Sequence, residues 1–275
     1  MDTGSALPPL DSLNESSIIS PHPASRIPHP ASRIPHPASR IENLSRYSVL
    51  AYTLLVRIIV NPAAAGGRLG REWPRLEKRL TAAGLEAETV FTEAPWHATE
   101  LAAAAVADGV TRVIAAGGDG TVTEVAEGIS RAGGEMAILP LGTGNDAART
   151  LGITTKLEEA AVIARDGAVR TVDLIAVGGH LVFNAIGVGM TGDINERAAR
   201  LKQTGRLWVR GISGYLLATL ASLFQYRRRD VTMTSEAGSF SGSMLILAVH
   251  GGPTTGGGIA LTPLAIHEDG LFDAC

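Results

Sequence analysis

The chain has 275 residues, 45% of them hydrophobic, and its formal net charge of −3 gives an isoelectric point near 6.2. This length suffices for two domains with separate cores, and the weak negative charge disfavours a generally basic nucleic-acid-binding protein. The single cysteine, Cys275, excludes an intramolecular disulfide. The apolar run at residues 49–60 contains Arg57 and is too short to span a membrane, and residues 1–40 lack the apolar core of a secretory signal. We therefore expect a cytoplasmic protein.

Residues 1–53 are predicted to form a disordered extension. Three near-identical heptads rich in Pro, His, Ser and Arg occupy residues 20–40, and two prolines in each period exclude a helical coiled coil. The histidines of the repeat are seven residues apart in a flexible segment, so they provide no preformed geometry for a metal ion. A translation start near Val49 or Val56 would leave this extension out of the protein.

Residues 54–169 show alternating strand and helix patterns. Such alternation predicts a parallel sheet with helices on both faces, whose ligands bind at the carboxyl ends of the strands. Asn61 and Asp119 follow predicted strands and therefore fall at these ends. The predicted strands are residues 54–60, 86–91 and 110–116, and the predicted helices are residues 72–83 and 97–108.

The segment 113–129 (VIAAGGDGTVTEVAEGI) predicts a phosphate-binding turn between an apolar strand and a helix. Gly117 and Gly118 allow close approach of a ligand to the backbone, and the following helix offers free N–H groups. We expect Thr121 to cap this helix, with Glu124 completing a capping box. An acidic residue beside phosphate, here Asp119, indicates a bridging cation such as Mg²⁺ or a hydrogen bond to a hydroxyl group. The P-loop lysine is absent.

After residue 169 the pattern changes to short strands with glycine-rich connections, which predicts a second, mainly antiparallel domain over residues 170–275. A predicted helix at residues 206–227 has an apolar stripe that either packs in the core or faces a membrane. The predicted strands are residues 171–177, 180–184, 230–234 and 244–250.

Three glycine-rich elements occur in order: Asn61-Pro62 to Gly66-Gly67, the GGDGT at residues 117–121, and LPLGTGND at residues 139–146. With the FNxxGxG segment at residues 183–189 and the GGG-to-DGLFD segment at residues 256–273, they resemble the diacylglycerol kinase catalytic-domain family. That family includes soluble bacterial lipid kinases, is related to sphingosine kinases and is more distantly similar to NAD kinases. The resemblance covers residues 56–273.

The resemblance implies a parallel-sheet α/β nucleotide-binding domain followed by a mainly antiparallel β-sandwich, which we expect to be incomplete at the C-terminus. It implies an enzyme that uses ATP and Mg²⁺ to phosphorylate a lipid hydroxyl, most simply diacylglycerol to give phosphatidic acid. The expected partner is a lipid alcohol at the inner membrane surface, with peripheral association and no nucleic acid; homodimer formation stays open. An NAD kinase and a non-catalytic fragment are the alternative interpretations.

Two carboxylates compete as proton acceptor in this interpretation, Asp269 and Asp119, and either could hold Mg²⁺ directly or through water. The Asp269-Gly270 pair is also a common hairpin-turn signal. The histidines outside the repeat lack metal-ligand spacing and are expected in polar surface or hydrogen-bonding roles. The predicted nucleotide-binding residues are Asn61, Gly66, Gly67, Arg68, Gly117, Gly118, Gly120, Thr121, Gly142, Thr143, Asn145 and Arg149.

Overall fold

A computed structural model describes residues 55–189, 228–235 and 238–275. The predicted extension at residues 1–53 and the predicted helix at residues 206–227 lie outside the described residues. The chain divides into two compact units, and the described residues among Asp230–Gly242 belong to a different unit from the rest. The predicted domain boundary at residue 170 stays a prediction.

The larger unit contains a four-stranded parallel sheet, as the alternating pattern predicted. The strand order is β2-β1-β3-β4, and each neighbouring pair is parallel. The chain leaves β1 toward one edge of the sheet and β3 toward the other, so the β1–β3 junction is a topological switch point. The strands are β1 (Val56–Val60), β2 (Glu88–Phe91), β3 (Arg112–Gly117) and β4 (Glu135–Pro140).

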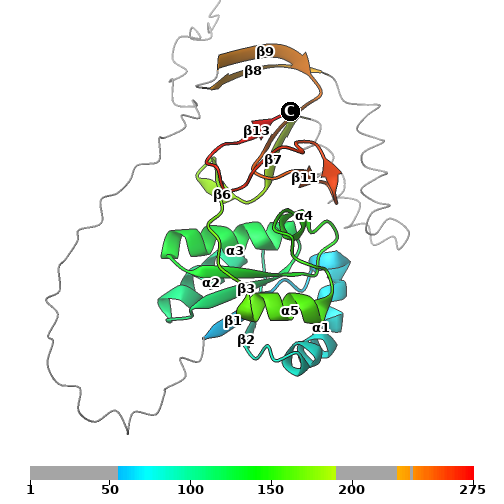
Figure 1. Cartoon of the computed structure of the whole chain (residues 1–275), viewed down its shortest axis with the longest axis vertical. Helices are drawn as coiled ribbons and strands as arrows, with labels where there is room; N and C mark the ends of the chain where they lie inside the picture. The colour runs from blue at the N-terminus through cyan, green and yellow to red at the C-terminus, as the bar shows by residue number, and fades with distance from the viewer. Residues whose placement is uncertain (1–54, 190–227, 236–237) are drawn as a thin grey trace, which may run out of the picture. The chain divides into compact units, whose positions relative to one another are not determined.

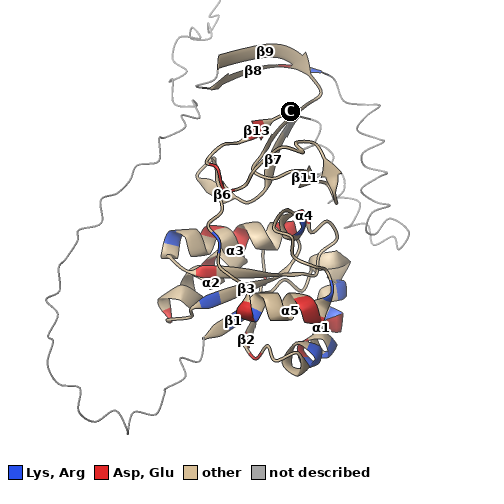
Figure 2. Ribbon diagram, viewed as in Figure 1, with Lys and Arg blue, Asp and Glu red and all other residues tan. Residues whose placement is uncertain are grey.

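Helices cover both faces of this sheet (Figure 1). Helices α1 (Ala64–Ala82) and α5 (Leu157–Asp166) pack on one face, and α2 (His97–Ala107) and α3 (Asp119–Ala132) pack on the other. Every residue of β3 is buried, because both faces of the sheet are covered. Charged residues lie mainly along the helices (Figure 2), so the helices provide the polar surface of this layered core.

The helix predicted at residues 72–83 belongs to α1, which begins earlier. Its first residues do not form a regular helix, because Ala65, Gly66 and Gly67 have positive φ angles of 50°, 69° and 78°. Glycine reaches this left-handed region at little cost, so the segment turns before the regular helix starts. The N–H of Gly70 then donates to the carbonyl oxygen of Pro62 (3.1 Å), which holds the turn against the end of β1.

The predicted capping box at Thr121 and Glu124 is wrong. Helix α3 begins at Asp119, its N-cap is Gly118, and no side chain caps it. Thr121 therefore lies inside the helix, and the Glu124 carboxylate instead accepts a hydrogen bond from the N–H of Ala98 at the start of α2 (3.2 Å). The strand runs directly into the helix through Gly118, which leaves the first helical N–H groups unblocked by a capping side chain.

The described strands after α5 pair antiparallel where their register is defined, which confirms the predicted change of architecture. The strand predicted at residues 171–177 is shorter, because Val172 and Leu174 pack against the core of the parallel sheet instead of pairing. The three-stranded sheet has the order β13-β10-β7. The strands of the larger unit that follow α5 are β5 (Ile175–Val177), β6 (His180–Val182), β7 (Ala185–Gly189), β10 (Ile246–His250), β11 (Thr254–Thr255), β12 (Ile259–Ala260) and β13 (Asp273–Ala274).

The smaller unit contains most of two further strands, β8 (Arg229–Ser235) and β9 (Gly238–Met244), which form a two-stranded sheet. Hydroxyl groups cross between them at Thr232 and Ser241 (2.9 Å). The predicted strand at residues 230–234 is therefore confirmed. Met244, at the start of another predicted strand, instead ends β9, and β10 begins at Ile246.

Candidate functional site

Two glycine-rich loops meet at the carboxyl ends of β3 and β4. The N–H of Leu141 donates to the carbonyl oxygen of Gly117 (2.9 Å). The backbones of Gly118 and Gly142 lie so close that a Cβ atom on Gly142 would come within 3.0 Å of the Gly118 nitrogen. Glycine is required there because a side chain would separate the loops. The structure thus brings together the GGDGT and PLGTGND segments, as their positions after strands predicted.

Asn61 joins this pair of loops from the end of β1. Its N–H donates to the carbonyl oxygen of Ala116 (3.1 Å), and its side-chain Nδ2 donates to Thr121 Oγ1 (3.1 Å). Its Oδ1 accepts from the N–H of Ala63 (3.0 Å). Thr121 is only 3% exposed and packs under Gly117. Asn61 and Thr121 therefore connect the loops internally, and the nucleotide contacts predicted for both residues stay predictions.

Asn145 shapes the second loop from within. Its φ of 53° lies in the left-handed region, which asparagine tolerates better than most residues, and its Oδ1 accepts from the N–H of Gly142 (3.0 Å). Thr143 is exposed at the tip of the loop. A Cβ on Gly144 would lie 2.8 Å from Oδ2 of Asp119, so this glycine admits the carboxylate.

Asp119 is the acidic group at the centre of the two loops. Its Oδ1 accepts from the N–H of Ala147 (2.9 Å) in the short helix α4 (Asp146–Thr150). Burial raises the pKa of Asp119, the nearby charge of Asp146 raises it further, and backbone hydrogen bonds, chiefly from Ala147, oppose the shift. A carboxylate that is costly to ionise gains from a neighbouring cation.

The donor set is compatible with Mg²⁺. Within the described part of the chain, no three His, Cys, Asp or Glu side chains form a metal-binding group. Mg²⁺ does not need one, because it commonly binds through one or two carboxylates together with waters and substrate phosphates. Asp119 is the carboxylate best placed to contribute at these loops.

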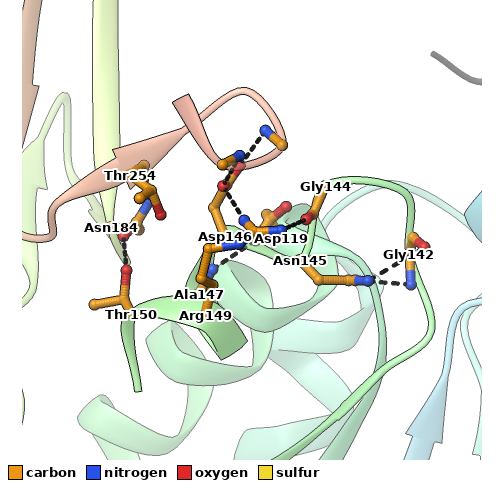
Figure 3. A network of polar contacts seen from close by, with 12 residues as sticks. Asp119, Gly142, Gly144, Asn145, Asp146, Ala147, Arg149, Thr150, Asn184 and Thr254 are labelled. Carbon is orange, nitrogen blue, oxygen red and sulfur yellow. Dashed lines mark hydrogen bonds and ion pairs between the residues drawn. The ribbon is translucent and has the colours of Figure 1, made fainter. Parts of the chain in front are cut away.

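Asp146 makes a contact that sequence reasoning missed. Its Oδ2 accepts from the N–H of Gly257 and its Oδ1 from the N–H of Gly258, both at 2.7 Å (Figure 3). The guanidinium of Arg149 donates to Oδ1 of the same carboxylate (2.6 Å) and to the carbonyl oxygen of Gly144 (3.2 Å). Arg149, predicted to face the nucleotide, thus has its charge compensated by Asp146. Both motifs in this contact, GTGND and GGG, were recognised in the sequence, but nothing in the sequence indicated that they bind each other.

The first glycine turn carries a second arginine beside the predicted one. Arg68 is exposed, with its Nε 4.0 Å from Glu72. Arg71 lies closer to the turn, because a Cβ on Gly67 would be 3.2 Å from its Nη1. The N–H of Gly67 is already used by the carbonyl oxygen of Ala63 (3.0 Å), whereas Gly66 is exposed. Arg71 was missed, although its position four residues after Gly67 on a helix could have indicated it.

Asp269 lies in an exposed turn. Its Oδ1 accepts from the N–H of Leu271 (3.0 Å), and the N–H of Gly270 donates to Oδ2 of Asp173 (2.8 Å). Gly270 has a φ of 74°, which glycine reaches at little cost, but the turn does not join a hairpin, because β13 pairs with β10. The described hydrogen bond of the Asp269 side chain stays within this turn, and its catalytic role stays a prediction.

The histidines differ in environment. Of the two roles predicted for the histidines, the polar surface is excluded for His250, which is 1% exposed between β7 and β13, and the hydrogen-bonding role remains. Burial lowers the pKa of His250, and the charges of Asp273 and Asp146 act in the opposite direction. His97 accepts a hydrogen bond from the N–H of Glu93 (3.1 Å). His180 stacks on Trp96, with ring centroids 4.3 Å apart.

The geometry defines an α/β protein whose glycine-rich loops meet at the carboxyl ends of its parallel strands, the edge where proteins of this class bind ligands. The family described as diacylglycerol kinase catalytic domain matches residues 55–177. A protein named diacylglycerol kinase from Mycobacterium tuberculosis is 31% identical over 225 residues, which cover 79% of this chain and 71% of that protein. The chain belongs to the diacylglycerol kinase catalytic-domain family.

Other similar proteins support this family assignment. A protein from Pseudomonas aeruginosa named "Probable lipid kinase YegS-like" is 36% identical over 194 residues, which cover 70% of this chain and 62% of that relative's length. A crystal structure of a diacylglycerol kinase from Bacillus anthracis is similar with a TM-score of 0.62 and 29% identity, covering 80% of this chain and 72% of that one. Across the described residues, no helix is both long and apolar enough to cross a membrane.

Proposed function

We propose that the protein transfers the γ-phosphoryl group of ATP to a lipid hydroxyl, most simply converting diacylglycerol to phosphatidic acid at the inner membrane surface. The observation that carries this proposal is the placement of Asp119 between two glycine-rich loops at the carboxyl ends of β3 and β4. Membership of the diacylglycerol kinase catalytic-domain family supports a kinase acting on a lipid. The relatives are named lipid kinase or diacylglycerol kinase, so experiment has to identify the lipid that is phosphorylated.

The backbone at the start of α3 suits the phosphate groups. Gly118 is the N-cap, and the first turn of the helix, including exposed Gly120, offers N–H groups and partial positive charge to an anion. Arg68 and Arg71 add positive charge beside the first glycine turn. Phosphoryl transfer depends mainly on such positioning and charge stabilisation.

The acceptor hydroxyl needs a group that takes its proton. Its oxygen bonds to the γ-phosphorus, the bond from that phosphorus to the β–γ bridging oxygen breaks, and ADP leaves with the released electron pair. Asp119 suits proton acceptance because it lies at the two loops and burial raises its pKa above the ordinary value of an aspartate, which makes it a stronger base. Asp269 is the second candidate. Bound Mg²⁺ would supply charge neutralisation at the phosphates, and whichever of the two carboxylates does not take the proton would hold it, directly or through water.

The test is incubation with labelled ATP and diacylglycerol, sphingosine, ceramide or NAD, each with and without Mg²⁺. We expect label in a lipid, dependent on Mg²⁺; label in NADP alone would overturn the proposal. Asp119→Asn should nearly abolish transfer, and Asp269→Asn reports whether the second carboxylate takes part. Asp166→Asn is the matched control, since this exposed carboxylate pairs with Arg165 away from the loops.

A further inference from the structure

Asp146 holds the glycine-rich segment at residues 251–258, which follows β10. Its carboxylate is almost fully buried, and both oxygens accept hydrogen bonds from this segment, at Gly257 and Gly258 (2.7 Å each). Gly256, Gly257 and Gly258 have φ angles of 63°, 89° and 105°, a left-handed run in which successive N–H groups converge on an anion. The buried carboxylate is thus the anion that this backbone binds.

A second polar contact joins the other end of α4 to the same segment. Thr150 Oγ1 donates to Oδ1 of Asn184 (2.9 Å), and Nδ2 of Asn184 donates to the carbonyl oxygen of Thr254 (2.8 Å). The carbonyl oxygen of Asn184 accepts from the N–H of Gly251 (2.8 Å). Asn184 is 7% exposed with a φ of 80°, so its side-chain amide and its strained backbone both serve this junction.

The nucleotide-side loops hold the same short helix. The N–H of Ala147, the residue after Asp146, donates to Asp119, and Gly144 just before the helix lies against both carboxylates. Figure 3 shows these contacts grouped around α4. Because Asp146, Ala147 and Thr150 belong to the same five-residue helix, a movement of the 251–258 segment that shifts Asp146 or Thr150 should also shift the N–H group of Ala147 that orients Asp119.

We propose that Asp146 and Asn184 are positioning residues, which couple the Asp119 loop to the 251–258 segment through α4. In the proposed kinase, this coupling keeps the C-terminal part of the chain aligned with the nucleotide-side carboxylate, so the kinetic consequence rests on the proposed function. The physical coupling between the two segments does not depend on the proposed function. Its disruption should lower turnover more than it changes binding of ATP, because the glycine turns after β1 and β3 remain intact.

The experiment follows hydrogen–deuterium exchange of the 251–258 segment with and without MgATP in the full chain. The variants are Asp146→Asn, which removes the charge and one acceptor, and Thr150→Val, which removes only the hydroxyl donor. Thr150→Ser restores that donor, and Thr89→Val removes a hydroxyl bonded to Glu77 elsewhere on the surface. We expect MgATP to slow exchange in the wild type and both controls, and this protection to fall about tenfold in the two variants.

The kinetic arm uses the lipid that the wild type phosphorylates. The two variants should lose about tenfold in kcat with KM for ATP within about twofold, and Thr150→Ser should recover the activity. Unchanged protection and unchanged kcat in Thr150→Val would overturn the inference, as would the absence of MgATP protection in the wild type. If Asp146→Asn fails to fold by circular dichroism, Thr150→Val decides. If the wild type phosphorylates no lipid, but only the two variants lose the MgATP protection, the proposed function is refuted and the coupling is supported.

Discussion

The same substitution at two glycines of α3 should have opposite effects on stability. Gly128 lies where α3 crosses α2, and a Cβ there would meet the backbone carbonyl of Thr99 and lie 2.9 Å from the Cβ of Ala102. Gly120 lies in the first turn of the same helix, and a Cβ on it would meet no other atom within 4 Å. Gly128→Ala and Gly120→Ala therefore compare one methyl group in a crowded and an open environment.

The magnitudes follow from two opposing contributions. Replacing glycine by alanine in a helix contributes up to about 1 kcal/mol of stability. Overpacking costs about 1–3 kcal/mol, and the upper part of that range applies at Gly128 because backbone atoms must move. Gly128→Ala should therefore destabilise the fold by about 1–2 kcal/mol, which lowers Tm by roughly 2–8 °C. Gly120→Ala should keep or raise Tm by a few degrees.

Thermal unfolding by circular dichroism and labelled-ATP turnover below Tm separate the two effects. Gly128→Ala should lose stability while folded protein retains its turnover, because the close contact lies between helices. Gly120→Ala should lose at least about tenfold in turnover, since its methyl group lies beside the N–H groups proposed to bind phosphate. A higher Tm for Gly128→Ala would refute the close packing of α2 on α3, and full turnover of Gly120→Ala would refute the phosphate site at this turn.

Three further outcomes are expected. Because the folded-state pKa of Asp119 is raised, the native state loses stability as pH rises through the range between the unfolded and folded pKa values. Asp119→Asn should therefore raise Tm at pH 7 and leave it unchanged below about pH 3.8. Melting curves at both pH values check this prediction. Arg112→Met should cost about 2–4 kcal/mol in urea unfolding, because buried Arg112 donates to two backbone carbonyls at the end of α5, whereas Glu135→Gln should cost under about 1 kcal/mol. Arg71→Ala should raise KM for ATP about threefold to tenfold in initial-rate assays, and an unchanged KM would remove Arg71 from the phosphate site.

The architecture of the parallel sheet could be predicted from the chain itself. Apolar runs such as the one in β3 indicate strands buried on both faces, and their alternation with amphipathic helices restricts the connections to a parallel sheet. Since parallel strands share one carboxyl edge, the positions of Asn61 and Asp119 after β1 and β3 already indicated that they lie near each other. Local order along the chain was enough for these conclusions.

Helix boundaries and side-chain roles depended on packing. The T-x-x-E pattern predicted that Thr121 caps α3, but the N-cap is Gly118, three residues earlier, and Thr121 is buried where it bonds Asn61. His250 was expected on the polar surface or in a hydrogen-bonding role, and strand pairing on both sides of β10 excludes the surface. A local pattern cannot register a competing partner from another element, and here that partner determined the role.

The sequence by itself determined the strand–helix alternation, the glycine turns and the acidic residue among them, because these depend on backbone freedom and on hydrophobic periodicity over a few residues. Only the tertiary structure decided that Asp146 holds Gly257 and Gly258, more than a hundred residues later in the chain. It also decided that burial and the charge of Asp146 raise the pKa of Asp119. Desolvation and charge–charge interactions depend on distances in space, which spacing along the chain does not specify.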